Sequence, residues 1–349
     1  MSHLDILLPF SLPPAELAAD LFNALKMPSF ATLLARANAQ RQRSLDEFSR
    51  RLPHETWLAD RCGIASSQAN TDIPVAAAVM RSHGMAPAEG FWFMLQPVHI
   101  HIARDHLVLT DTRQLSISEE ESRLLFSIAQ LIFEEAGKTV MYGDAGTWFL
   151  RADDWSTLRT ATPDAACGHN IDIWMPKGDS ELAWRKLQNE VQMHWHTHQV
   201  NNEREARGMT PVNSIWLWGG SPAVSPGRAK YYSDAYHLHG LSKALIAETA
   251  ARLHDGDAAD IMKAPPERGL LVLDKLVAPA LAGDWSAWLD EMHSVEAHWL
   301  VPLLSALKRG AIGKLTLALS DHAALSEFIA TPWSLRKFWV KPALARLSR

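Results

Sequence analysis

Cysteine is scarce in this 349-residue chain, which contains only Cys62 and Cys167. The two are too far apart in the sequence to form a CxxC motif, so no thiolate zinc site or dithiol redox motif is present. One disulfide is possible in principle, but two free thiols are equally compatible with a reducing compartment.

Positive charge and long apolar runs are also in short supply. The chain has 34 Lys and Arg against 39 Asp and Glu, a net charge of −5, so nothing favours binding to a phosphate backbone. No apolar run approaches the roughly 20 residues that span a bilayer. The opening MSHLDILLPFSLPP lacks the basic start and the cleavage site of a signal peptide. We therefore expect a cytoplasmic protein with no nucleic-acid or membrane partner.

Three nucleotide and nucleophile motifs are missing. The sequence has no GxSxG, no GxGxxG after a strand-like segment and no GxxxxGK[ST]. These absences disfavour a serine hydrolase, a Rossmann dehydrogenase and a P-loop NTPase.

The hydrophobic pattern predicts an α/β protein. Leu4–Pro9 is a short apolar run typical of a buried strand, and residues 118–136 form a capped amphipathic helix. Strand 269–274, helix 285–308 and strand 314–319 alternate, which indicates parallel pairing in one sheet. The charged run 39–52 is interpreted as the solvated face of a helix.

The clearest predicted helix spans residues 181–204 and carries a polar stripe beside its apolar face. Trp184, Leu187, Val191 and Trp195 define the apolar face. The polar stripe and the residues just after it form the candidate binding set: Glu190, His194, His198, Asn201, Arg204, Arg207 and Asn213.

Three interpretations of this set stay open. Two guanidinium groups beside imidazoles are suited to a phosphate or carboxylate ligand. The same groups serve equally as a satisfied polar network or as helix caps. A third interpretation is a divalent metal bound by Glu190, His194 and His198, although the spacing is not HExxH.

Tryptophan is unusually frequent, with 14 residues against 4 tyrosines. Trp216 and Trp218 share one face of the predicted strand NSIWLWGG. Large core side chains are favoured there over a surface that stacks on bases or sugars.

Several blocks resemble the RpfE-type regulatory proteins of bacteria. The longest is HTHQVNNEREARGMTPVNSIWLWGGSP, and the others are LLPFSLPP, LPHETWLA and QPVHIHIARDHLVL. This resemblance implies a regulatory context and no particular mechanism.

A more distant resemblance is to the archaeal-type cofactor-independent phosphoglycerate mutases of the alkaline phosphatase superfamily. The matching positions are His198, Asn201, Arg204, Gly208, Asn213, Trp218 and Gly219. The resemblance implies an alkaline-phosphatase-like, mostly parallel sheet flanked by helices, with an inserted smaller α+β domain. We expect the α/β core in residues 1–60 and 205–349 and the insertion in residues 61–204.

The metal ligands that the superfamily uses are mostly replaced. Pro9-Phe10-Ser11 stands where its active members have an aspartate, and only Asp321 and His322 match a metal pair at a strand end. These two alone cannot hold two metals. We therefore predict a degenerate, non-catalytic phosphomutase-like protein without a cofactor, which binds an anionic metabolite or a protein partner in a regulatory role.

Two alternatives remain. One is an active metal-dependent phosphomutase or phosphatase that uses a rearranged metal set including Asp321 and His322. The other is a purely structural interaction protein with a tryptophan-rich interface.

Overall fold

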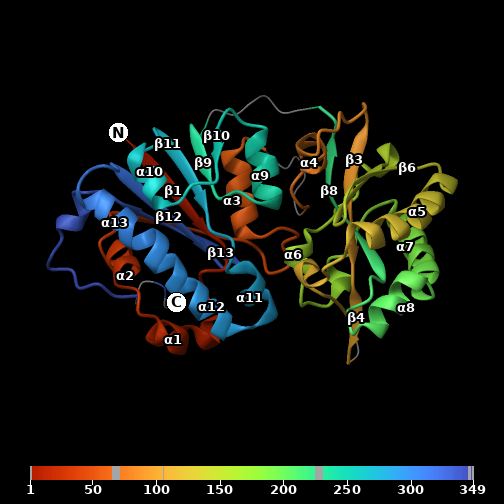
Figure 1. Ribbon diagram of the computed structural model, residues 1–349, viewed down its shortest axis with the longest axis horizontal. Helices are drawn as coiled ribbons and strands as arrows, with labels where there is room; N and C mark the ends of the chain where they lie inside the picture. The colour runs from red at the N-terminus through yellow and green to blue at the C-terminus, as the bar shows by residue number, and fades with distance from the viewer. Residues whose placement is uncertain (1, 65–70, 105, 225–230, 345–346, 348–349) are drawn as a thin grey trace. The chain divides into compact units, whose positions relative to one another are not determined.

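The computed structural model describes residues 2–64, 71–104, 106–224, 231–344 and 347 (Figure 1). The chain divides into two compact units. Unit 1 contains residues 1–47, 53–62 and 228–349, and unit 2 contains residues 48–52 and 63–227. Among the described residues, no helix combines the length and apolar character needed to cross a membrane.

Unit 1 is built on a seven-stranded sheet with the order β10-β9-β11-β1-β12-β13-β2. The strands from β10 to β12 run parallel to one another, whereas β13 is antiparallel to both of its neighbours. The predicted mostly parallel sheet flanked by helices is therefore confirmed (Figure 1). The strands are β1 (His3–Leu8), β2 (Ala39–Ser44), β9 (Asp234–Tyr236), β10 (Arg252–His254), β11 (Arg268–Val272), β12 (Lys314–Ser320) and β13 (Ala324–Ala330).

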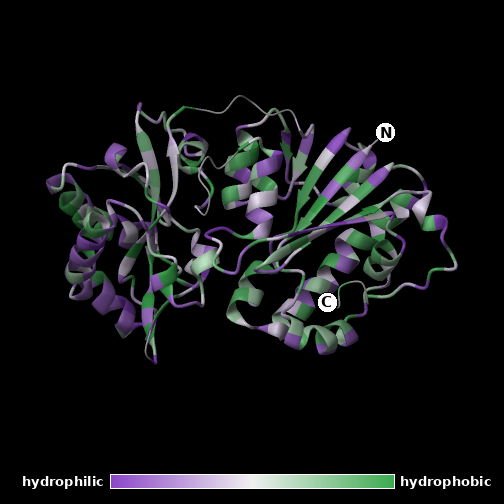
Figure 2. Ribbon diagram, turned by 180° about the vertical axis from the view of Figure 1, so that it is seen from behind, coloured by the Kyte–Doolittle hydropathy of each residue, from purple (hydrophilic) through white to green (hydrophobic). Residues whose placement is uncertain are grey.

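Alternation along β1 explains how the sheet is covered. Leu4, Ile6 and Leu8 point into the main hydrophobic core, where helices pack over them, and Asp5 points to the opposite face. The middle of these strands is hydrophobic in Figure 2, as expected for a sheet covered by helices. The helices of unit 1 are α1 (Ala15–Ala24), α2 (Pro28–Ala35), α3 (Pro53–Arg61), α9 (Gly240–Ala247), α10 (Ala258–Lys263), α11 (Val277–Ala282), α12 (Trp285–Val295) and α13 (Val301–Lys308).

The predicted helix 285–308 contains a π-helical turn, Glu296–Leu300, between α12 and α13. Glu296 is buried, and its carboxylate accepts hydrogen bonds from the backbone N–H of Ser29 at 2.7 Å and of Phe30 at 3.0 Å. It thereby caps the start of α2, where the helix dipole favours negative charge.

Unit 2 contains an antiparallel sheet with the order β6-β7-β3-β8 and a separate hairpin of β4 and β5. Helices α5 and α7 pack against each other, and α7 also packs on β8. The strands are β3 (Phe91–Val98), β4 (Ile100–Ala103), β5 (His106–Leu109), β6 (Thr139–Asp144), β7 (Thr147–Arg151) and β8 (Ser214–Pro222). The helices are α4 (Ala76–Ser82), α5 (Glu119–Glu135), α6 (Pro163–Ala166), α7 (Glu181–His196) and α8 (Gln199–Ala206).

The later boundary of the inserted unit differs from the expected one. Residues 205–227 were expected in the core domain, but β8 pairs with β3, so this stretch belongs to unit 2. The pairing across the sheet decides the division, and local sequence pattern does not reveal it.

The charged run 39–52 does not form a solvated helix, so that prediction is wrong. Its first half is the edge strand β2, which pairs with β13. Arg50 is buried, and its guanidinium donates to the carbonyl oxygens of Ile173, Trp174 and Met175 at 2.9–3.1 Å. Its charge therefore serves the packing of unit 2 instead of a surface.

Candidate functional site

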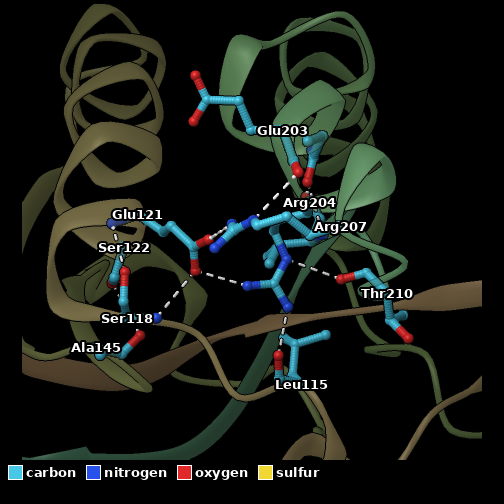
Figure 3. Close-up of polar contacts among 11 residues, drawn as sticks. Leu115, Ser118, Glu121, Ser122, Ala145, Glu203, Arg204, Arg207 and Thr210 are labelled. Carbon is cyan, nitrogen blue, oxygen red and sulfur yellow. Dashed lines mark hydrogen bonds and ion pairs between the residues drawn. The ribbon is translucent and has the colours of Figure 1, made fainter.

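Arg204 is held inside unit 2 by partners of its own chain (Figure 3). It is 0% exposed, and its Nε donates to the carbonyl oxygen of Thr210 at 2.8 Å. Nη1 lies 2.6 Å from Glu121 Oε2, and Nη2 donates to the carbonyl oxygen of Leu115. Each nitrogen of the guanidinium thus already has an acceptor inside the protein.

Glu121 is the anion that this pair of arginines binds. Its other carboxylate oxygen pairs with Arg207, and Oε2 also accepts the backbone N–H of Ser118 at 3.0 Å. Burial works against ionisation of this carboxyl group, but the Ser118 bond and the two guanidinium groups outweigh it and hold its pKa below the ordinary value. An internal carboxylate therefore occupies the position that the sequence pattern assigns to an anionic ligand.

Helix 181–204 is broken, which removes the predicted polar stripe. His198 has an extended backbone, and its Nδ1 accepts the N–H of Val200 at 3.2 Å, which caps α8. Asn201 donates to the carbonyls of Trp195 at 2.8 Å and Val212 at 2.9 Å and accepts the N–H of Val212 at 2.8 Å. The amide therefore joins the end of α7 to the segment before β8.

The remaining candidates of the block also serve structure or lie apart. Asn213 exchanges two hydrogen bonds of 2.8 Å with the backbone of Ile100, as a peptide group would in a strand pair. His194 is exposed on α7. Glu190 lines a separate cavity of about 390 Å³ together with Lys138 and Lys186.

The seven residues do not converge on one cavity. Arg204 and Arg207 come together through Glu121, and His198, Asn201 and Asn213 bond to nearby backbone. This geometry matches the polar-network interpretation and gives no support to an anion or metal site in the block. Trp216 and Trp218 are 1% and 6% exposed, so their predicted core role is confirmed.

The carboxyl ends of the parallel strands in unit 1 form a second candidate site, where α/β folds place their ligands. The loop after β1 turns at Phe10, which has a left-handed backbone with φ of 55°. Trp288 Nε1 donates to the Phe10 carbonyl at 2.8 Å, and Ser11 Oγ donates to the Leu8 carbonyl at 2.8 Å. These bonds fix a strained loop that presents no carboxylate.

Asp321 and His322 follow β12 at the same edge. Asp321 Oδ1 accepts the backbone N–H groups of Ala323 at 2.8 Å and Ala324 at 2.6 Å, an Asx-type turn at the strand end. The His322 ring lies edge-on to Phe10, with 4.8 Å between centroids. A cavity of about 240 Å³ opens here, with the lining Phe10, Leu12, Pro13, Pro14, Ala15, Ala280, Trp285, Asp321, His322 and Ala323.

The donor set at this edge does not fit a two-metal centre. Asp321 and His322 are the sole carboxylate and imidazole in the cavity lining, and one oxygen of Asp321 is committed to the turn. Across the described ranges, no group of three or more His, Cys, Asp or Glu side chains is arranged to hold a metal. A dinuclear site needs several such ligands for each ion.

The opposite face of the unit 1 sheet carries a buried ionic cluster that the sequence pattern did not single out. Asp5 is 2.7 Å from His3 Nε2 and accepts the Tyr232 hydroxyl at 3.0 Å. Nearby, Arg61 Nη2 lies 2.8 Å from Glu327. The one feature of the sequence that points to this cluster is Asp5, an acidic residue between Leu4 and Ile6 in an otherwise apolar strand.

Unit 1 is a mostly parallel sheet flanked by helices, with a cavity at its carboxyl edge. Comparison with known proteins adds sequence relatives and structures of the same fold. No protein-family model matches the chain. It is 25% identical over 182 residues to a 2,3-bisphosphoglycerate-independent phosphoglycerate mutase 2 of Methanothermobacter thermautotrophicus, which covers 48% of this chain and 44% of the relative. It is 26% identical over 159 residues to a probable mutase of this type from Geobacter sulfurreducens, covering 44% of this chain and 38% of the relative.

The chain is thus distantly homologous to cofactor-independent phosphoglycerate mutases, and the match spans less than half of these relatives' length. Among solved structures, a protein of Pyrococcus horikoshii aligns with a TM-score of 0.52 and 13% identity over 95% of this chain and 87% of that one. A cofactor-independent phosphoglycerate mutase from Thermoplasma acidophilum aligns with a TM-score of 0.48 and 15% identity over 99% and 94%. The Pyrococcus match shows a shared fold.

Proposed function

We propose that this chain is a non-catalytic, phosphomutase-like protein that binds a protein partner at the carboxyl edge of unit 1 in a regulatory role. The observation that carries the proposal is the cavity beside Phe10, which sits where the fold places its chemistry but is walled mainly by apolar side chains. The resemblance to RpfE-type regulatory proteins supports the regulatory part.

The chemistry of the cavity favours an apolar group over a phosphate. Phe10, Leu12 and Trp285 supply apolar surface, and Asp321 places a carboxylate at the wall. A carboxylate repels an anionic ligand, and this lining contains no Lys or Arg to offset it. Of the two ligand classes predicted from the sequence, the geometry therefore supports a protein side chain better than an anionic metabolite.

Turnover assays test the non-catalytic part. Purified protein is supplied with manganese or zinc and assayed for phosphatase activity and for phosphoglycerate mutase activity, the activity named for its relatives. We expect no turnover above that of heat-treated protein. Turnover that Asp321→Ala abolishes and Asp290→Ala preserves would show an active enzyme, because Asp290 is an exposed carboxylate on α12 outside the cavity.

Blocking the cavity tests the binding part. Ala15 is exposed at the start of α1 and lines the cavity, so Ala15→Trp fills the space without disturbing the core. Cross-linking from a photoreactive residue at position 285 is expected to capture one defined protein, and the Ala15→Trp change is expected to remove it. Ala259→Trp, at an exposed position of α10, is the matched control. Capture that survives Ala15→Trp would contradict the proposal.

A direct test of the anion alternative uses 3-phosphoglycerate as the probe. Isothermal titration is expected to show no saturable binding to the wild-type protein. Saturable binding that Arg207→Ala removes would instead establish an anion site in unit 2, because Arg207 is 54% exposed and its loss is expected to leave the fold intact.

A further inference from the structure

The segment after β13 exposes three aromatic side chains on unit 1. Trp333, Phe338 and Trp339 are 71%, 81% and 69% exposed, although most large apolar residues of the chain are buried. The rings of Phe338 and Trp339 meet edge-to-face with 5.2 Å between centroids. Solvent-facing aromatic clusters of this kind mark interaction sites.

Hydrogen bonds and a buried leucine hold this segment against the rest of unit 1, so the aromatic side chains are exposed on an ordered backbone. Leu335 is buried, and Arg36 at the end of α2 donates to the carbonyl oxygens of Leu335 at 3.1 Å and Val340 at 3.4 Å. Thr331 and Ser334 exchange hydrogen bonds that close the turn before Leu335. The aromatic rings are therefore presented on a pre-ordered turn.

Positively charged residues flank these rings along the chain. Residues 331–349 contain five Lys and Arg and no Asp or Glu, in a chain whose net charge is −5. For three of them, Arg336, Lys337 and Lys341, the described contacts include no ion pair. Cations without internal partners next to exposed rings call for a negatively charged partner.

A groove continues from the same segment. Its volume is about 600 Å³, and it is lined by α1, the loop to α2, the first turn of α2 and residues 342–344. Phe22, Leu25 and Met27 give it apolar walls, and its lining includes Lys26 and no carboxylate. Apolar surface and positive charge therefore continue beyond the aromatic turn.

We propose that the Trp333–Lys341 turn, with the adjoining groove, is a peripheral docking surface for an anionic lipid bilayer, in contrast to the absence of a membrane partner expected from the sequence. Tryptophan and phenylalanine sit at the boundary between headgroups and acyl chains, and Lys and Arg beside them are attracted to anionic headgroups. Two rings at 82° to each other suit wedging into such a boundary better than parallel stacking on successive bases of a nucleic acid. This surface shares no lining residue with the carboxyl-edge cavity, so it stands independently of the proposed function.

Co-sedimentation of the full chain with vesicles tests the surface. Wild-type protein is expected to bind vesicles of phosphatidylcholine with phosphatidylserine, to bind pure phosphatidylcholine vesicles much less, and to be released by high salt. The variant Phe338→Ser/Trp339→Ser is expected to lose about tenfold or more in affinity, as is Arg336→Gln/Lys337→Gln/Lys341→Gln.

Matched controls use exposed residues elsewhere. Leu182→Ser/Met193→Ser removes apolar surface that is 81% and 76% exposed in unit 2 and is expected to leave vesicle binding unchanged. Lys243→Gln/Lys275→Gln/Lys308→Gln removes three exposed cations from unit 1 and is expected to have at most a small effect.

Three results would overturn the proposal. The first is vesicle binding that is absent or unaffected by both segment variants. The second is a wild-type dimer in sedimentation analysis that the aromatic variant dissociates, because the surface would then bind a second copy. The third is tighter binding to a single-stranded oligonucleotide than to anionic vesicles.

Discussion

Arg204 shows how a residue with the chemistry of a ligand-binding group can be committed to structure. A buried guanidinium with acceptors on each nitrogen and a paired Glu121 forms a closed arrangement. Removing one member of such a pair leaves the other charge buried without compensation, which costs more than the pair itself contributes.

Replacing Arg204 is expected to destabilise unit 2 strongly. Arg204→Met should lower the free energy of unfolding by about 3–5 kcal/mol, because two carbonyl oxygens lose their donor and Glu121 loses its buried ion-pair partner. Arg207→Met is the matched control, since Arg207 is 54% exposed and pairs with the same carboxylate, and it should cost less than about 1 kcal/mol. Urea denaturation measures both, and equal losses would contradict this account.

Asp72 makes a separate, pH-dependent contribution in unit 2. It is 2% exposed, and its Oδ2 accepts the Gly219 N–H at 2.6 Å and the Thr160 hydroxyl at 2.9 Å. Burial raises its pKa from 3.8 to about 6, against the opposing effect of these hydrogen bonds. Because the pKa is raised on folding, the stabilisation is fully present below pH 3.8 and is lost as the pH rises through about 6.

Asp72→Asn should remove this pH dependence. The difference in unfolding free energy between wild type and variant is expected to change by about 3 kcal/mol between pH 3.5 and pH 7.5, with the wild type relatively more stable at the acidic end. Denaturation at both pH values provides the measurement. A difference that stays constant, or one that changes in the opposite direction, would contradict a raised pKa of Asp72 in the folded protein.

Among the elements, those with local signals could be predicted from the sequence and those fixed by distant contacts could not. The capping box of Ser118 and Glu121 starts α5 close to where the pattern placed it. The apolar run of β1 likewise predicts a buried strand, and the structure shows this strand paired on both sides. No proline or glycine marks the break between α7 and α8. The break is fixed instead by a hydrogen bond from Asn201 to Val212, eleven residues away, which the local pattern does not reveal.

The same limit applies to the candidate site. The spacing of polar residues in the block makes Arg204 a candidate binding residue. Its ion-pair partner Glu121 lies 83 residues earlier in the chain, so the spacing could not reveal that Arg204 is already paired. Asp321 and His322 were correctly placed at the end of a strand, because strand and turn signals are local.

The break at His198 yields a prediction about Asn201. Asn201→Ala should cost about 3 kcal/mol of unfolding free energy, because it leaves the buried N–H and carbonyl oxygen of Val212 without the amide and removes one donor to the Trp195 carbonyl. Asn202→Ala, at the exposed neighbouring position, should change stability by less than about 0.5 kcal/mol. Chemical denaturation of both variants checks this, and a neutral Asn201→Ala would mean that the turn is held by other contacts.

For the whole chain, fold and chemistry point to different conclusions. A mostly parallel sheet with its carboxyl edge open to a cavity is an arrangement on which many enzymes are built. In this chain the edge carries Phe10, Asp321 and His322, and Arg204 and Arg207 are bonded internally to Glu121. Among the described residues, this edge offers one carboxylate and one imidazole in its cavity lining, too few ligands for two metal ions.

Metal content tests that conclusion. The protein is incubated with manganese and with zinc, dialysed, and analysed by mass spectrometry for bound metal, with Asp321→Ala in parallel. The account predicts less than one metal per chain and the same value for the variant. Two metals per chain, lost in Asp321→Ala, would contradict it and identify the carboxyl edge as a working two-metal centre.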